Sequence, residues 1–373
     1  MLSKSIKVNN SLKLKNRNNV YKNLYFSKKS KTKKEIELEL GISLPTISQN
    51  LQSLCKLGLV KEDYSEEFTG GRKSCVYQIV DNKYYSVGIS LTDVYIRLLI
   101  TDLRLNQLAY KKIKYTCKEF EDISKFICDE LFIFLNENNI EQYKIMGVGI
   151  AIPGLLDYKN KIIITAPTLG FKNISYKVIE EIIPFNVYVE NDATAGGIAE
   201  FNRIKKTNLA YILWENGIGG AIIINNNIYG GDDIKAAEFG HICVVPNGRE
   251  CRCGKKGCLE EYIRSSRFNV DLGITTEDFF EEIKNGNKEY YKMFDESLQY
   301  LAMTIRNIKQ ILDCDIILGG HVTAHIKPYF NILENYVYSD NDKHKYLYLS
   351  EYGDKVVAKG MALYFIQKFI KNI

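Results

Sequence analysis

EFGHICVVPNGRECRCGKKGCLEE, residues 238–261, is the stretch of sequence from which the fold can be predicted. It places His241 a short distance before Cys251, Cys253 and Cys258. Three thiolates and one imidazole at such separations are typical of a closed tetrahedral zinc site. Ordinary reduced cysteines, packed as small apolar side chains, are the alternative. The loop is rich in basic residues and glycine and does not read as a core strand, so a Zn²⁺ site is favoured.

Two carboxylates, Glu238 and Glu260, flank these four candidate metal ligands. A zinc ion that fixes the loop would also fix the carboxylates, and carboxylate oxygens accept hydrogen bonds from sugar hydroxyls. The stretch therefore predicts a sugar site beside a structural zinc site.

The pattern E-x-G-H followed by C-x-C-G-x-x-G-C-x-E resembles the ROK family, which groups sugar-responsive repressors, open reading frames and sugar kinases. The resemblance extends over nearly the whole chain. It implies an α/β fold over residues 81–373, in which two α/β lobes of the sugar-kinase type, with actin/hexokinase and ribonuclease H-like architecture, enclose a cleft.

Length and composition describe an ordinary globular protein. The chain has 373 residues, 46% of them hydrophobic and 25% charged, which is enough for two or three domains. It contains no apolar run of the roughly 18 residues that a membrane span needs, and no signal-peptide pattern at its start. Nine cysteines without regular pairing suit a reducing compartment. We expect a cytoplasmic protein without a membrane partner.

Positive charge is concentrated at the N-terminus. Residues 1–80 carry 15 basic and 7 acidic side chains, a net +8, whereas the remainder carries 35 and 38, a net −3. The first 34 residues include eleven basic side chains and no acidic one. This distribution predicts contact with nucleic acid, with residues 1–18 as a basic arm. A solvated, partly disordered tail remains the alternative for the arm.

Residues 32–62, TKKEIELELGISLPTISQNLQSLCKLGLVKE, predict a helix-turn-helix. A first helix over about 33–40 ends at the turn residue Gly41, and Ser43 caps a second helix. Ile47, Leu51, Leu54 and Leu57 recur at helical spacing and should face inward. The second helix should then enter a DNA major groove through short polar side chains. The candidate contacts are Ser43, Thr46, Ser48, Gln49 and Asn50.

A wing follows the second helix. Leu59 and Val60 can start a strand, and Gly70 and Gly71 precede Arg72 and Lys73. Flexible glycines that present Arg72 suit a narrow A·T-rich minor groove, and ROK repressors carry a Gly-Gly-Arg here too. We therefore expect a winged helix-turn-helix over residues 19–80 that binds operator DNA. A winged helix that makes only protein contacts is the alternative.

From about residue 84 onward, strands and helices alternate. A strand over 187–189 brings Asn191 and Asp192 to the start of a helix, the end of a strand at which open α/β sheets bind ligands. In kinases of the family the matching Asp is the general base. A turn that merely caps the helix is the alternative. The expected sugar-binding residues are Gly154, Asn191, Asp192, Glu238, His241 and Glu260.

Both phosphate-binding turns of the family's kinases are altered. Ser90, Thr92 and Val94 stand where the kinases have an acid, a glycine and a threonine, and Glu215 and Asn216 replace a Gly-Thr pair. A carboxylate facing a polyphosphate is repulsive. We expect a degenerate kinase fold that is not an enzyme, in which Asp192 keeps only the position of the base.

These expectations combine into a transcriptional repressor, a homodimer or dimer of dimers, that binds operator DNA and is released by a monosaccharide. The runner-up is an active ATP-dependent sugar kinase with an attached DNA-binding domain. A third possibility is a regulator whose ligand tightens DNA binding, because induction and corepression use the same residues. Xylose, glucose and N-acetylated amino sugars all remain candidate effectors.

Overall fold

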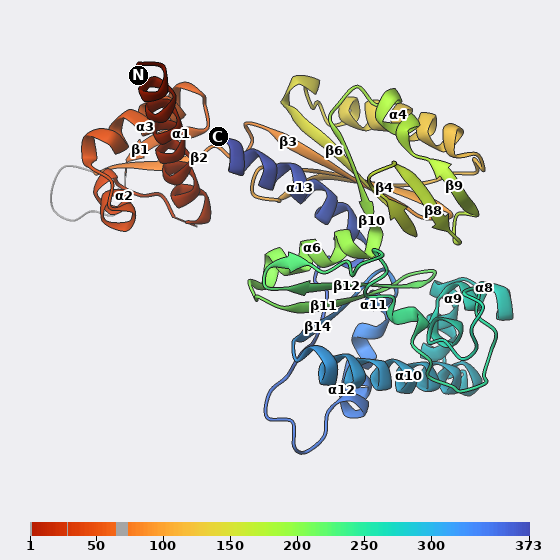
Figure 1. The fold of residues 1–373 in the computed structure, drawn as a ribbon. Coiled ribbons are helices and arrows are strands. Elements are labelled where there is room, and N and C mark those ends of the chain that lie inside the picture. The colour runs from red at the N-terminus through yellow and green to blue at the C-terminus, as the bar shows by residue number, and fades with distance from the viewer. Residues whose placement is uncertain (1, 28, 65–73) are drawn as a thin grey trace.

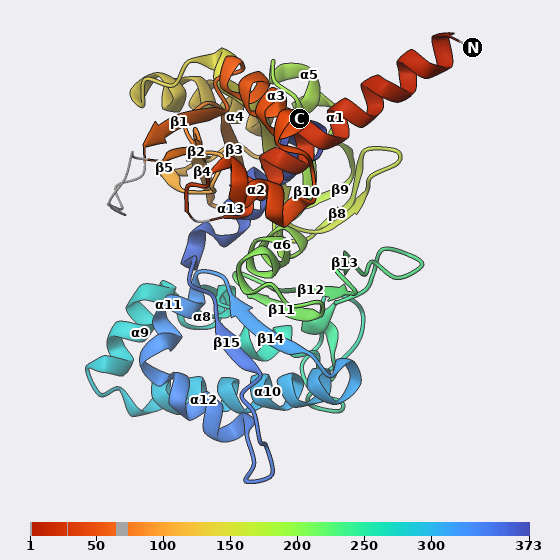
Figure 2. The same cartoon turned by 90° about the vertical axis from the view of Figure 1, so that its left-hand side faces the viewer.

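The computed structural model describes residues 2–27, 29–64 and 74–373. It consists of a small N-terminal body and two α/β lobes (Figure 1). Figure 1 shows the N-terminal body to one side of the first lobe, and in the view turned by 90° the second lobe lies below both (Figure 2). Among the described helices, none combines the length and the apolar character needed to cross a membrane.

The N-terminal body consists of three helices and a two-stranded sheet. The helix expected over residues 33–40 is α2, and it begins with a capping box in which Thr32 and Glu35 bond each other's backbone. Gly41 ends it in the left-handed conformation, with φ 63°. The sheet is antiparallel. The elements are α1 (Leu2–Phe26), α2 (Lys33–Leu40), α3 (Leu44–Lys56), β1 (Val60–Tyr64) and β2 (Cys75–Ile79).

Three details of this body differ from the sequence analysis. The boundary expected after residue 18 lies inside α1. Leu57, expected to face inward, is 46% exposed, because α3 ends at Lys56 and its packed face ends with it. Ser43 occupies the N-cap position of α3 without capping it, since its hydroxyl lies 3.0 Å from that of Thr46 instead of bonding a free backbone amide.

The first lobe is built on a five-stranded sheet in the order β10-β6-β3-β4-β5. Helices α4 and α5 cover one face, and α13 packs on the strands from the other side (Figure 1). A small sheet, β7-β8-β9, extends the lobe. The elements are β3 (Tyr85–Leu91), β4 (Tyr95–Thr101), β5 (Gln107–Lys114), α4 (Phe120–Glu137), η1 (Gln142–Lys144), β6 (Ile145–Ile152), β7 (Leu155–Asp157), β8 (Ile162–Ala166), β9 (Phe171–Ser175), α5 (Lys177–Ile182) and β10 (Val187–Asn191).

The second lobe repeats this topology in its sheet, whose order is β13-β12-β11-β14-β15. In each sheet three strands form an antiparallel meander and two further strands join in parallel, so the predicted pair of α/β halves is present. Helix α6 packs on one face and the long α10 on the other (Figure 1). The elements are α6 (Asp192–Ile204), β11 (Leu209–Trp214), β12 (Ile218–Ile224), β13 (Asn227–Ile228), η2 (Phe239–His241), α7 (Glu260–Ile263), α8 (Ser266–Leu272), α9 (Thr276–Lys284), α10 (Lys288–Leu312), β14 (Asp315–Gly319), α11 (Val322–Ile326), η3 (Lys327–Tyr329), α12 (Phe330–Val337), β15 (Leu347–Leu349) and η4 (Gly353–Lys355).

The last helix, α13 (Val356–Asn372), connects all three bodies. It lies against β3 and β6 of the first lobe and against α6 of the second. A Cβ atom on Gly88 would come within 1.8 Å of the Ala358 carbonyl oxygen, and one on Gly360 within 1.8 Å of the Ala195 carbonyl oxygen. Only glycine fits at these two positions, so the helix sits at backbone contact with both neighbours.

The C-terminal part of α13 completes the core of the N-terminal body. Ile366, Ile370 and Ile373 are buried in the same hydrophobic cluster as residues of α1, α2, α3 and the two-stranded sheet. Asn18 donates its side-chain amide to the Ile370 carbonyl at 2.6 Å. The N-terminal body is therefore packed onto the two-lobed fold and is not a separate module on a linker.

Replacing Ile366 by alanine should destabilise the N-terminal body. Ile366 is fully buried in the shared cluster, so the substitution leaves a cavity that typically reduces the free energy of unfolding by about 2–5 kcal/mol. Denaturant unfolding measures the loss, and limited proteolysis shows whether residues 13–79 are cleaved first. Lys371→Ala, on the exposed side of the same helix, is the control. Equal stability of the two variants would contradict the shared core.

Candidate functional site

A cavity of about 800 Å³ lies between the two lobes. Its walls come from the β10–α6 junction, the start of β7, strand β12 and the loop that contains the four candidate metal ligands. All six residues predicted to bind sugar line it: Gly154, Asn191, Asp192, Glu238, His241 and Glu260. The structure thus brings together residues from three separate parts of the sequence.

Asn191 is both part of the cavity wall and the cap of α6. Its side-chain oxygen accepts from the Thr194 amide at 2.9 Å, and its side-chain nitrogen donates to the Gly154 carbonyl at 2.9 Å. Gly154 has φ 121°, and a Cβ there would lie 2.3 Å from the Thr165 carbonyl oxygen, so glycine is required. Asn191 therefore does cap α6, as the alternative interpretation of the sequence expected. The same side chain also holds the Gly154 turn at the cavity.

Asp192 is the first residue of α6, and its carboxylate accepts from the Ala193 amide at 2.8 Å. Burial raises the pKa of Asp192 to about 7, and the carboxylates of Glu215 and Glu238 push it the same way. A side chain of this kind changes charge near neutral pH. It can accept a hydrogen bond from a ligand hydroxyl, and such a bond favours its ionised form.

Glu260 is held by partners on both of its oxygens. One accepts from the Ile218 amide at 3.1 Å, and the other from the Arg252 guanidinium at 3.0 Å. Arg252 also lines the cavity, and the sequence analysis missed it as a site residue. Its place between Cys251 and Cys253, eight positions before Glu260, was the available signal.

His241 and the three cysteines form a compact group with the geometry of a metal site. The four candidate ligand atoms lie within 4.8 Å of one another. Cys251 Sγ lies 3.5 Å from His241 Nδ1, and Cys253 Sγ lies 3.7 Å from Cys258 Sγ. Tetrahedral bonds of about 2.3 Å to sulfur and 2.0–2.1 Å to nitrogen would separate such pairs by about 3.6 and 3.8 Å. The residues therefore fit a four-coordinate metal ion.

The remaining nitrogen of His241 points away from this group. His241 Nε2 lies 3.8 Å from a carboxylate oxygen of Glu238, which also lines the cavity. A carboxylate beyond a ligating histidine orients the ring. The cluster and the cavity thus share His241, and anything that fixes the cluster fixes this wall of the cavity.

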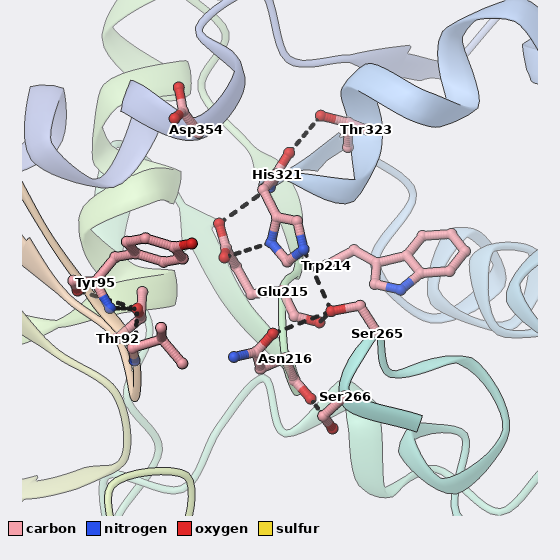
Figure 3. Close-up of polar contacts among 12 residues, drawn as sticks. Thr92, Tyr95, Trp214, Glu215, Asn216, Ser265, Ser266, His321, Thr323 and Asp354 are labelled. Carbon is pink, nitrogen blue, oxygen red and sulfur yellow. Dashed lines mark hydrogen bonds and ion pairs between the residues drawn. The ribbon is translucent and has the colours of Figure 1, made fainter. Parts of the chain in front are cut away.

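A buried ion-pair network joins the two lobes beside the cavity. Arg97 of β4 is 3% exposed, and its two terminal nitrogens each lie 3.3 Å from one oxygen of Glu215, which follows β11. Glu215 also accepts from the His321 amide at 3.0 Å and lies 2.6 Å from His321 Nδ1 (Figure 3). Burial alone would raise the pKa of Glu215, but Arg97 and His321 outweigh it and hold the pKa well below its usual value.

A second layer of contacts fixes this network. Ser265 donates to the Glu215 carbonyl at 3.0 Å and lies 3.3 Å from His321 Nε2, and Ser266 donates to the Asn216 carbonyl at 2.7 Å (Figure 3). The side-chain amide of Asn216 bonds Asp93 across the cleft. The space left here is about 30 Å³, and Thr92 and Glu215 are among the residues that line it. This is room for a few water molecules.

Sequence reasoning expected Glu215 to stand alone as a misplaced acid and missed its partners. Arg97 precedes it by 118 residues, and His321 follows it by 106. The one available signal was an arginine inside the apolar strand YIRLLIT, because a charge in such a strand needs a partner.

The residues expected to contact DNA lie on α3 and beside it. Ser43 and Gln49 are exposed, and Thr46 and Ser48 are half-buried. Asn50 differs, because it is 3% exposed and donates its side-chain amide to the Thr46 carbonyl at 2.8 Å. Arg72 and Lys73 lie outside the described residues.

The amino-acid sequence is similar to those of known proteins. The sequence profile of the ROK family matches residues 86–368. The chain is 32% identical over 227 residues to the xylose repressor of Bacillus subtilis (strain 168), a match that covers 60% of this chain and 59% of that protein. The chain therefore aligns with about three fifths of that relative.

Two solved structures share the fold. A ROK-family transcriptional regulator, described as a homologue of the E. coli MLC protein, superimposes with TM-score 0.72 and 19% identity over 96% of this chain and 99% of its own. A ROK-family glucokinase from Streptomyces griseus, in complex with glucose and AMPPNP, superimposes with TM-score 0.65 and 24% identity over 75% of this chain and 98% of its own. At these identities the likeness establishes the fold.

Asp192→Asn should stabilise the protein, and more so at pH 8 than at pH 5. The raised pKa of Asp192 means that the folded protein loses stability between pH 3.8 and about 7, as the unfolded chain ionises first. The asparagine variant escapes this loss. About two pH units of the window lie above pH 5, so the gain should differ by about 1–3 kcal/mol between the two pH values.

Denaturant unfolding at both pH values measures the effect. Asp340→Asn, at an exposed position, is the control and should give the same small change at pH 5 and pH 8. A stability gain from Asp192→Asn that does not vary with pH would show that Asp192 titrates normally.

Proposed function

The chain belongs to the ROK family, and on that premise we propose that it is a sugar-responsive transcriptional repressor. In this proposal the N-terminal body binds operator DNA, and a monosaccharide that enters the cavity between the lobes releases it. The observation that carries the proposal is that α13 borders at one end, through Val357, the narrow space beside Glu215 that adjoins the cavity, and packs at the other end in the core of the N-terminal body. The likeness to a protein named xylose repressor supports it.

The N-terminal body is proposed to be a winged helix-turn-helix. The succession of α2, the Gly41 turn, α3 and an antiparallel pair of strands supports this assignment. Helix α3 would enter the major groove, with Ser43, Thr46, Ser48 and Gln49 toward the bases. Asn50 is left out, because its amide is already bonded to the helix backbone. Arg72 and Lys73 would reach the adjacent minor groove from the wing.

The sugar is proposed to bind at Gly154, Asn191, Asp192, Glu238, His241 and Glu260. Carboxylates accept hydrogen bonds from adjacent hydroxyls, and the Arg252 that bonds Glu260 offers a donor at the same wall. Glu260 is fixed by two partners, whereas Asp192 has only its own helix start and Glu238 only His241 Nε2 at 3.8 Å, so Asp192 and Glu238 are the carboxylates with free acceptor capacity.

We further propose that the metal is Zn²⁺, held by His241, Cys251, Cys253 and Cys258. A closed four-ligand zinc site supplies rigidity and no open position for a substrate. Its contribution here would be to hold the loop that presents Glu238 and His241 to the sugar.

The proposal excludes kinase activity on the ground of the buried network. A nucleotide phosphate would have to approach the Glu215 carboxylate, and Arg97 is already bonded to that carboxylate on both oxygens. The Asn216 to Asp93 contact narrows the same space further. An active ATP-dependent sugar kinase with an attached DNA-binding domain, which the position of Asp192 alone would allow, is therefore the weaker candidate.

Release of DNA is proposed to follow a change in the angle between the lobes. Such a change would move α13 and with it the N-terminal body. In a homodimer or dimer of dimers, the two α3 helices must stand about one DNA turn, or 34–36 Å, apart to bind adjacent half-sites. A shift in that spacing would release the operator.

Purified protein should contain about one zinc per chain, as the four-ligand site requires. Cys253→Ser removes a ligand and should lose the metal, as measured by elemental analysis. Cys243→Ser is a matched control, since Cys243 is an exposed cysteine of the same loop that is not part of the cluster. Full zinc content in Cys253→Ser would refute the ligand assignment.

Operator binding and sugar binding should be separable by mutation. With an operator selected from random duplexes, Gln49→Ala should weaken DNA binding by about 1–3 kcal/mol through lost base contact and leave sugar affinity unchanged. Asp192→Asn should leave DNA binding intact and blunt release by the sugar found in a thermal-shift screen. Anisotropy titrations measure the first effect and calorimetry the second.

Gln299→Ala, exposed on α10 of the second lobe, is the control for both measurements. If the Asp192→Asn variant is still released from the operator at the same sugar concentration, this cavity is not the sensor. ADP formation from ATP with the bound sugar would instead favour the kinase.

A further inference from the structure

The cavity continues well beyond the six residues assigned to the sugar. Its total volume of about 800 Å³ lies near the upper end of the roughly 300–1,000 Å³ found for pockets that hold drug-sized ligands. A single pyranose, with about a dozen non-hydrogen atoms, is small for such a space. The remainder is lined mainly by aromatic and aliphatic side chains, among them Tyr158, Tyr188, Ile222, Ile228, Tyr229 and Ile234.

The cavity can accommodate a larger ligand in one direction. Toward the Arg97, Glu215 and His321 network the space narrows to about 30 Å³. In the other direction the wall is formed by β12, β13 and the loop that follows them. A ligand whose first ring lies at Asp192 and Glu260 would therefore extend toward Tyr229.

Three large apolar side chains stand exposed at this end of the cavity. Ile228 is 41% exposed, Tyr229 52% and Ile234 46%, and all three line the cavity. Single exposed apolar residues are common and need no explanation. Three within seven positions on one cavity wall form an apolar surface of the kind that marks a binding site.

The backbone of Ile234 gives independent support. Its φ is 58°, in the left-handed region that β-branched residues rarely adopt and that costs on the order of 1–3 kcal/mol. Glycine would take this conformation without that cost. An isoleucine in its place is explained if its side chain is needed at the cavity wall.

Polar groups line the same cavity and indicate what it binds. Glu190 is 8% exposed and accepts from the hydroxyls of Tyr188, at 2.7 Å, and of Tyr158. Lys235, next to Ile234, lines the cavity as well. A sugar ring has apolar C–H faces and a rim of hydroxyls, so it matches tyrosine and isoleucine surfaces edged by donors and acceptors. A plain alkyl group would match only the apolar side chains of this wall and would make no use of the polar ones.

We propose that Ile228, Tyr229 and Ile234, with Lys235 and Tyr158 at the edge, form a second subsite that takes the second ring of a disaccharide. The proposal rests on the proposed function, since the first ring occupies the polar end of the cavity assigned there. It changes the class of effector: a two-ring saccharide binds more tightly than its monosaccharide unit.

Calorimetry with three matched pairs tests this: xylose and β-1,4-xylobiose, glucose and cellobiose, and N-acetylglucosamine and its β-1,4 dimer. For the pair that binds, the disaccharide should bind at least about 10-fold more tightly, consistent with burial of one aromatic face. Tyr229→Ala should abolish most of this difference and leave the monosaccharide affinity within about twofold.

Ile234→Gly separates a ligand contact from a structural role. It removes the side chain and relieves the backbone, so the disaccharide should bind less tightly while the unfolding temperature stays unchanged or rises. Ile224→Ala is the control, because Ile224, at the end of β12, is 37% exposed and is not among the residues that line the cavity. It should leave both affinities unchanged.

Four outcomes would overturn the subsite. If a monosaccharide binds and no disaccharide exceeds it, the subsite is refuted and the repressor proposal stands. If the advantage of the disaccharide survives both Tyr229→Ala and Ile234→Gly, these residues do not form the subsite. If octyl glycosides gain affinity and disaccharides do not, the surface takes an alkyl group. If no sugar binds and none affects operator binding, the subsite and the proposed function both fall.

Discussion

The rest of the structure depends on the close packing of helix α13 between the two lobes. Gly88 and Gly360 allow contact with backbone atoms on either side, and any larger residue would push the helix away from β3 or from α6. Val357, at its start, borders the narrow space beside Glu215. Ile370, near its end, lies in the core of the N-terminal body. One rigid element therefore sets how the two lobes and the N-terminal body sit relative to one another, and a change in lobe angle cannot leave the N-terminal body where it was.

The two carboxylates at the inner end of the cavity have opposite environments. Glu215 is compensated by Arg97 and His321 and stays ionised, whereas burial without such partners raises the pKa of Asp192 to about 7. Breaking a buried ion pair by removing one partner is strongly destabilising, which makes Glu215 a structural residue that spans the lobes. Asp192 has free acceptor capacity and is the one suited to meet a ligand. Each carboxylate directly follows a β-strand, Asp192 after β10 and Glu215 after β11. Their different roles therefore follow from the side chains that surround them.

Sequence alone predicted the parts of this protein that local patterns determine. The helix α2, the turn at Gly41 and the ligand spacing of the His241 cluster all lie within short stretches, where periodicity and loop chemistry decide the outcome. That Asp192 and the His241 cluster lie at one cavity was predicted only from the resemblance to a family. Periodicity failed for Asn50, because it assigns a helix face and says nothing of how deeply a neighbouring element covers it. Long-range pairing was invisible: Arg97 meets its partner across 118 residues, and the repeated strand topology has no counterpart in a repeated sequence.

The sharing of one core by both ends of the chain has a consequence for biosynthesis. Residues such as Leu24 and Ile47 leave the ribosome first, yet the isoleucines that complete their packing, Ile366 and Ile370, follow more than 300 residues later. At about 5–20 residues per second, that interval lasts tens of seconds. During it the apolar face of the N-terminal body is uncovered, so the segment made first reaches its final packing last. The N-terminal body is thereby finished only in a chain whose two lobes have already been synthesised.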